Sequence, residues 1–209
     1  MIDRRLEHAL DAWAAAAFGD DDGAARLQPW LSRWAEEVGA PRGDDDDAEA
    51  WVRTRCDWAL VEMGAGQGCP GDDHDDALRR RLGGSHVGLF EVWPTEQGKA
   101  WLRDRVAGIA LQLDAVVDLR PEARGPAALW ELRVVVEGAR LLAVRPPLSY
   151  PLELVAVLDE LRPPAETPPP ADGGAALLQA LRHARLWHGR AGRIDPRPGF
   201  AAAIRRVAP

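Results

Sequence analysis

The spacing of apolar residues changes at about residue 85, and this change constrains the fold more than any other feature of the chain. Before it, apolar residues recur every three or four positions, as in Leu6, Leu10 and Trp13, which is the spacing of one face of an amphipathic helix. After it, apolar and polar residues alternate over short stretches, beginning with HVGLFEVW at 86–93, as is typical of strands. Helices followed by strands predict an α+β fold.

Residues 1–84 are expected to form an acidic, tryptophan-rich helical module. Asp3 can cap the first helix, and Pro29 is expected in the first turn of the second, where its missing N–H does no harm. The third helix follows Asp44–Asp47, and a short fourth helix completes the module. The third helix is expected to bury one face made of Val52, Cys56, Ala59 and Met63, flanked by Trp51 and Trp58.

Five strands with short connections are expected next, and they predict a five-stranded antiparallel, barrel-like sheet. They are 86–93, 99–106, 108–117, 126–136 and 139–144. By the period of two, Trp130, Leu132, Val134 and Val136 share one face of the fourth strand, and Glu131, Arg133 and Val135 share the other. If Asp104 points into the barrel, it needs a partner such as Arg105 or a hairpin N–H, because an unpaired buried carboxylate is costly.

Four segments are expected along the chain. They are the helical module 1–84, the sheet with its closing helix 85–161, a proline-rich linker 162–174 and a basic helical tail 175–209. The closing helix is expected to place Leu152, Val155, Leu158 and Leu161 inward.

The net charge of −7 is unevenly distributed, because residues 1–84 carry −9, residues 85–170 carry −3 and residues 171–209 carry +5. The simplest interpretation is that the basic tail docks on the acidic front of its own chain or of a second copy. The alternative is nucleic-acid binding, since clustered arginines contact phosphates.

The tail residues that could bind a partner or a nucleic acid are mostly arginines. They are Arg182, Arg185, Trp187, Arg190, Arg193, Arg205 and Arg206. Trp187 would add a ring on which a base could stack. The opposing interpretation is a helix whose leucines dock and whose arginines remain in water.

Several stretches resemble an uncharacterised group of bacterial proteins that have a helical front and a small β-barrel. They are CDWALVE, SHVGLFEVW, AWLRDRVAGIALQL and WELRVVVEGARLLAVRPPLSYP, within about residues 50–160. Members of that group often end in a zinc-binding SEC-C motif, which needs a dense cysteine cluster. This chain has no cysteine after Cys69, so that motif is missing. The resemblance implies a fold and brings no catalytic residues.

A metal site is the sharpest chemical hypothesis for the front of the chain. Cys56, Cys69 and His74 are the candidate ligands, but twelve residues separate the thiols, whereas structural zinc sites usually have two to four. The carboxylates of Asp44–Asp47 and Asp72–Asp76 could serve a metal-dependent hydrolase only if the two groups meet. We therefore expect helix caps and free thiols, with no metal and no cofactor.

The leading functional hypothesis is a non-enzymatic protein-interaction module or adaptor. Only three serines, one tyrosine and one lysine are present, and no nucleophile elbow or phosphate-binding loop occurs. The chain is expected to be cytoplasmic and not membrane-bound, because it shows neither a signal peptide nor a run of about 18 apolar residues. The expected partner is another protein, with nucleic-acid binding and metal-dependent hydrolysis as the alternatives.

Overall fold

The computed structural model describes residues 2–64, 73–94, 100–113, 126–138, 140–162, 174–192 and 194–207. The helices of these residues are α1 (Arg4–Gly19), α2 (Asp21–Glu37), α3 (Ala48–Asp57), α4 (Asp73–Gly83), α5 (Glu153–Leu161), α6 (Ala175–Ala191) and α7 (Arg197–Val207). A π-helical turn, η1 (Trp58–Glu62), follows α3 directly. Among the described residues, no helix is long and apolar enough to cross a lipid bilayer.

The strands form one curled antiparallel sheet. They are β1 (His86–Pro94), β2 (Ala100–Asp104), β3 (Ala110–Leu113), β4 (Ala128–Glu137), β5 (Arg140–Ala143) and β6 (Leu148–Tyr150). The order is β3, β2, β1, β4, β5, and β6 pairs with the other half of β4. The five expected strands and the α+β class are therefore confirmed, while β6 was not expected.

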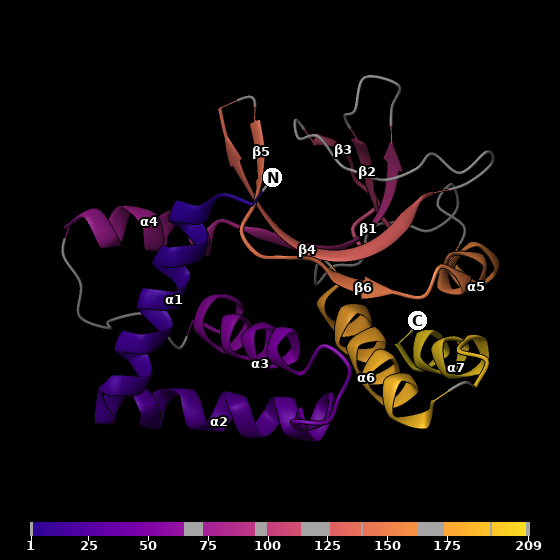
Figure 1. Cartoon of the computed structure of the whole chain (residues 1–209), viewed down its shortest axis with the longest axis horizontal. Coiled ribbons are helices and arrows are strands. Elements are labelled where there is room, and N and C mark those ends of the chain that lie inside the picture. Colours follow the sequence, from indigo (N-terminus) through magenta and orange to yellow (C-terminus); the bar gives the residue numbers. More distant parts are fainter. Residues whose placement is uncertain are drawn as a thin grey trace.

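The two faces of the sheet pack into different cores, as the alternation of residues predicts. On the concave face, a small apolar core contains Phe90, Val92, Leu102, Leu132, Val134 and Leu141. The opposite face packs on the helices, which gather along the convex side of the sheet (Figure 1). Leu129 and Val135 of β4 belong to this larger core, so each face of β4 is assigned as the sequence indicates.

The corner between α1 and α2 corrects the expected position of Pro29. Asp20 alone joins the two helices, and its side chain accepts the N–H of Gly23 at 2.8 Å. A side chain at Gly23 would overlap the carbonyl oxygen of Ala17, so glycine permits this close approach. Since α2 begins at Asp21, Pro29 lies inside the helix rather than in its first turn, and the prediction was wrong.

The buried face of α3 also differs from the prediction. Trp51 is fully buried, whereas Val52 is 51% exposed. Burial of an indole removes far more apolar surface from water than burial of a valine does, so the helix turns Trp51 inward. The π-helical turn η1 then inserts an extra residue into the helical repeat and brings Trp58, Ala59 and Leu60 to the core.

The closing helix matches the prediction only in part. Leu158 is buried as expected, and Val155 and Leu161 are partly buried against the core, but α5 also buries Leu154 and Val157 and leaves Leu152 41% exposed. It begins at Glu153, so Leu152 precedes its first turn.

The helices at the end of the chain are part of the main core. Leu178 and Leu181 of α6 and Phe200 of α7 are almost completely buried in the same cluster as Leu10 of α1 and Leu129 of β4. The acidic front, the sheet and the basic segment thus share one hydrophobic interior. Of the linker expected at 162–174, residues 163–173 lie outside the described part of the chain.

Candidate functional site

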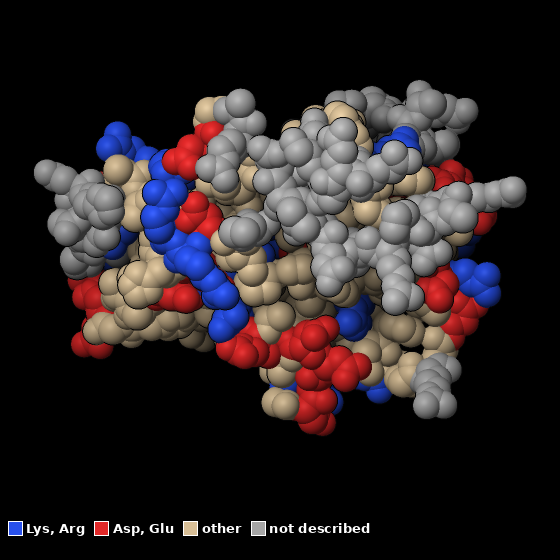
Figure 2. All heavy atoms as spheres, turned by 45° about the horizontal axis from the view of Figure 1, so that its top comes forward, with Lys and Arg blue, Asp and Glu red and all other residues tan. Residues whose placement is uncertain are grey.

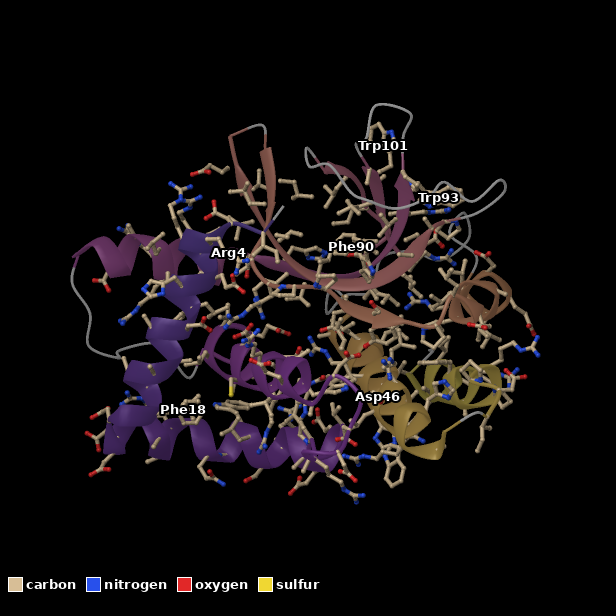
Figure 3. All side chains as sticks on the ribbon, viewed as in Figure 1. Arg4, Phe18, Asp46, Phe90, Trp93 and Trp101 are labelled. Carbon is tan, nitrogen blue, oxygen red and sulfur yellow. The ribbon has the colours of Figure 1, made fainter. Side chains whose placement is uncertain are left out.

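Arginines of α6 bind the acidic segment that precedes α3, within one chain. The guanidinium of Arg190 donates to both carboxylate oxygens of Asp45, at 2.7 and 2.8 Å, and to the carbonyl of Ala40 at 2.6 Å. Arg185 donates to Asp47 at 3.3 Å. Figure 3 places the neighbouring Asp46 beside α6. The expected contact between the basic segment and the acidic front is present, and it uses two candidate arginines.

These contacts replace the helix-capping role expected of the four aspartates. Asp47 is at the N-cap of α3 in a left-handed conformation, and its side chain makes no capping hydrogen bond. The Arg190 hydrogen bond, with help from the Arg42 backbone N–H, lowers the pKa of Asp45 to about 2.

Arg182 lies deeper and is not available to a partner, because only 1% of the residue is exposed. Its Nε and Nη2 donate to Glu131 at 2.9 and 2.6 Å, and its guanidinium lies 5.0 Å from the ring centre of Trp34. Burial disfavours the charged form, but attraction to Glu131 and Glu62 outweighs burial and raises the pKa of Arg182 above its ordinary value.

The other candidate residues of the tail differ in their surroundings. Trp187 is 52% exposed, and the Arg190 guanidinium lies 5.7 Å from its ring centre. Arg205 and Arg206 are exposed in the last turn of α7. Arg193 lies outside the described residues. Of the six described candidates, Arg182, Arg185 and Arg190 thus make ion pairs within the chain.

The metal candidates are only partly described. Cys56 is a half-buried free thiol, and burial raises its pKa. Cys69 and the side chain of His74 lie outside the described part of the chain. Within the described part, no three histidine, cysteine or acidic side chains are grouped closely enough to hold a metal ion.

A layer of paired charges lies between the convex face of the sheet and the helices. The sequence did not predict that these charges form one unit. Arg145 binds Asp57 with two hydrogen bonds of 2.9 and 3.0 Å. Arg133 of β4 donates to Glu62 at 2.7 Å and to Ser85 at 2.8 Å. With Glu131 and Arg182, these residues form what we call the polar layer. The signal in the sequence was the pair Glu131 and Arg133 on the same face as Val135.

The polar layer lines a partly open cavity of about 50 Å³. Six charged side chains line it, namely Arg53, Asp57, Glu131, Arg133, Arg145 and Arg182. Thr54 of α3 also contributes to its wall.

A histidine and an aspartate meet on the concave face of the sheet. His86 Nε2 lies 2.5 Å from Asp104 Oδ2, and Asp104 Oδ1 accepts the N–H groups of Val106 and Ala107 at 2.7 and 3.2 Å. The expected hairpin N–H is thus the partner of Asp104, while Arg105 pairs with Glu91 and Asp159. Asp104 organises the turn after β2, and no nucleophile of the described residues contacts the imidazole.

Two tryptophans lie side by side on the outer part of the sheet. Trp93 of β1 pairs across the strands with Trp101 of β2, and they are 37% and 48% exposed. Figure 3 shows both at the end of the sheet that is farthest from α1. Cross-strand aromatic pairs stabilise a hairpin, which accounts for them without a ligand.

A groove of about 390 Å³ lies between α1 and α4. Leu6, Ala9, Ala12 and Leu78 give it an apolar lining, and Arg5, His8 and Arg81 contribute its charged and polar lining. Ligand sites are typically clefts of about 300–1,000 Å³ with an apolar lining and a few polar groups. The groove therefore has the size and the lining of a binding site, and it is our candidate functional site.

Highly exposed arginines border this groove, although the protein as a whole is acidic. The side chains of Arg4 and Arg5 are 83% and 72% exposed, whereas their partners Glu7 and Asp3 are 12% and 11% exposed. Figure 2 shows basic side chains gathered in a stripe on the side of the molecule that carries α1 and α4. Glu137, which is 40% exposed, also lies 3.8 Å from Arg5 and accepts a hydrogen bond from Arg81 at 2.8 Å. Arg4 and Arg5 are nevertheless more exposed than any of these carboxylate partners.

Comparisons with known proteins give no match: no family model, no curated protein and no solved structure is similar to the chain at the level that would identify a relative. The resemblance to bacterial proteins with a SEC-C motif therefore stays a prediction, and the function must be argued from the site.

Proposed function

We propose that this protein is a non-enzymatic interaction module and that it binds an acidic amphipathic helix of a partner protein in the groove between α1 and α4. The observation that carries the proposal is the combination of a 390 Å³ apolar groove with the highly exposed guanidinium groups of Arg4 and Arg5 at its border. A helix that lays its apolar face in a hydrophobic groove is a recurrent mode of protein recognition.

The shape of the groove supports a helix as the ligand. Ala9 and Ala12 are small, so the side chains of a second helix can approach the backbone of α1 closely. Leu78 of α4 forms part of the opposite wall. Leucines at a helical spacing could fill this floor, and glutamates on either side of them would meet Arg5 and Arg81.

Designed peptides test this proposal. One helical peptide carries leucines on one face and glutamates beside them, a second has lysines in place of the glutamates, and a third is a scrambled version of the first. Fluorescence anisotropy with the full chain should show the acidic helix binding at least about tenfold more tightly than the basic one, a difference of about 1.4 kcal/mol. Added salt should weaken the acidic peptide's binding.

Ala12→Glu places a carboxylate in the groove and should weaken binding of the acidic peptide at least about tenfold. Ala25→Glu, at an exposed alanine of α2, is the matched control and should leave binding within about twofold. Equal binding of the acidic and scrambled peptides, or equal affinities of the two variants, would overturn the proposal. So would binding of a fatty-acid anion in the groove without binding of any peptide.

A further inference from the structure

The cavity in the polar layer has a wall that is both cationic and hydrogen-bond accepting. Arg53, Arg133, Arg145 and Arg182 provide four positive charges, while Asp57 and Glu131 provide two negative charges. The other carboxylate partners do not line the cavity: Glu62, which pairs with Arg133, is 26% exposed, Asp11 is 53% exposed and Glu49 is 79% exposed. The wall itself is therefore positive, and it keeps two carboxylates beside its guanidinium groups.

The arginines are held in place and still have N–H groups to donate. Arg145 uses one N–H each of Nε, Nη1 and Nη2 on Asp57 and Asp11, and a guanidinium has five. Arg133 uses Nη1 and Nη2, and its Nε makes no hydrogen bond to a described residue. Their positions are fixed by buried ion pairs, so little ordering is required when a small ligand enters.

The carboxylates retain capacity to accept hydrogen bonds. Glu131 Oε2 accepts one bond, from the Tyr150 hydroxyl at 3.0 Å, and each oxygen of Asp57 accepts one from Arg145. An ionised carboxylate oxygen can accept two. An anion that also carries a proton can therefore donate to Asp57 or Glu131, whereas an anion without one would only be repelled by them.

We propose that this cavity is a binding site for a protonated phosphate group. A buried water requires about 10–15 Å³, so a cavity of about 50 Å³ has room for one small oxyanion. At neutral pH phosphate carries one or two protons. Its P–O–H groups would donate hydrogen bonds to the carboxylates, while its other oxygens accept hydrogen bonds from the arginines. Sulfate has the same shape and no proton, so the site selects phosphate over sulfate. This proposal does not depend on the groove between α1 and α4.

Thermal unfolding of the full chain at pH 7 tests the selectivity, with inorganic phosphate or sulfate at about 10 mM and chloride used to equalise ionic strength. For a dissociation constant about ten times lower than this, phosphate should raise Tm by about 3–5 °C. Sulfate should raise it by less than about 1 °C. Titration calorimetry should show one phosphate bound per chain, and glycerol 3-phosphate tests whether the group enters as a free ion or as a monoester.

Arg53→Gln should abolish most of the phosphate effect. Arg33→Gln is the matched control. Arg53 pairs with Glu49 on α3 at 2.5 Å, and Arg33 pairs with Glu37 on α2 at 2.6 Å. Both are exposed pairs of residues four positions apart. Each substitution removes one such pair, worth about 0.3–0.5 kcal/mol, but only Arg53 lines the cavity. Thr54→Val, which changes the wall without changing charge, should weaken phosphate binding more than Arg33→Gln does.

Equal effects of phosphate and sulfate would show general ion screening and would overturn the proposal. An unchanged phosphate effect in Arg53→Gln would overturn it as well.

Discussion

Several charged side chains of the sheet face protein rather than water, and each has a partner fixed by geometry. Glu131 and Arg133 are 5% and 6% exposed, yet both make hydrogen bonds to side chains of other elements. Removing ions from water costs several kcal/mol each, and their attraction repays this cost only when the remaining hydrogen bonds are satisfied. Such pairs fix which helix meets which strand, and we regard them as determinants of register more than of stability.

Gly88 shows how closely the concave face is packed around one of these charges. A Cβ at this position would overlap Asp104 Oδ2 and lie 2.7 Å from Asp104 Cγ. The Asp104 carboxylate has no room to retreat, because it is fully buried and held by two backbone N–H groups and by His86.

We therefore expect Gly88→Ala to lower the free energy of unfolding by about 1–3 kcal/mol, the usual cost of overpacking. Chemical denaturation measures it. Gly199→Ala, at a position in α7 with open space around it, should be neutral or slightly stabilising, since alanine favours a helix. Equal stabilities of the Gly88 variant and the wild type would show that Asp104 does not occupy this place.

At the level of helices and strands, periodicity predicted where elements occur better than how they are rotated. The five strands were correct because alternation is local, whereas β6 is only three residues long and its pairing with β4 depends on a distant partner. The predicted rotation of α3 about its axis was wrong, because burial of the two tryptophans outweighs burial of the regular stripe of smaller residues. Pro29 was misplaced because the helix begins directly after its N-cap Asp20, and the sequence does not show which of the successive aspartates is the cap.

The candidate groove could not be predicted from sequence patterns, because it too depends on contacts between distant segments. Its floor consists of alanines and leucines that also occur in any helix core, and its two walls come from helices more than 50 residues apart in the chain. The polar layer was partly visible, because Glu131 and Arg133 alternate with core residues, but their partners Arg182 and Glu62 come from other segments.

The contact between α6 and the acidic segment gives a prediction about pH. The pKa of Asp45 falls from 3.8 in the unfolded chain to about 2, chiefly because Arg190 hydrogen-bonds to it. A lowered folded-state pKa stabilises the fold above the unfolded value, and this stability is lost as the pH falls toward the folded value. The side chains of Asp45 and Arg190 are only 4% and 14% exposed, but little other protein surrounds the pair, so after solvent screening we expect it to contribute about 1 kcal/mol.

Asp45→Asn should accordingly be about 1 kcal/mol less stable than the wild type above pH 5, and the difference should shrink to zero between about pH 4 and pH 2. Urea denaturation at a series of pH values measures it. Asp46→Asn is the control, because Asp46 is exposed and makes no hydrogen bond to a described residue, and it should differ by less than about 0.5 kcal/mol throughout. A difference for Asp45→Asn that does not change with pH would contradict the assignment.

For the molecule as a whole, the decisive feature is that the acidic front, the sheet and the basic helices share one hydrophobic core. The front and the sheet region are both negative and the last segment is positive, and the ion pairs of Arg182, Arg185 and Arg190 join them where they meet. The positive charge of the last segment is thus largely used within the chain. Exposed arginines remain in the last turn of α7, at Arg205 and Arg206, and beside the groove between α1 and α4, at Arg4 and Arg5.

This shared core predicts a single cooperative unfolding transition. Leu10 of α1 and Leu178 of α6 are 0% and 3% exposed in the same cluster, so Leu10→Ala and Leu178→Ala should each lower the free energy of unfolding of the whole chain by about 2–5 kcal/mol. Scanning calorimetry should show one transition in each variant, with equal calorimetric and van't Hoff enthalpies. Phe18→Ala, at a residue that is 45% exposed, should have a much smaller effect.

A chain cut after Pro170 would lose Leu178, Leu181 and Phe200 from this core and would leave Glu131 without the guanidinium of Arg182. Because a buried charge that loses its partner costs about 3–5 kcal/mol, and each lost leucine about as much again, we expect the shortened chain to show no cooperative transition. Two separate transitions in the full chain, with Leu178→Ala moving only one of them, would instead mean that α6 and α7 fold as an independent unit that docks on a stable front.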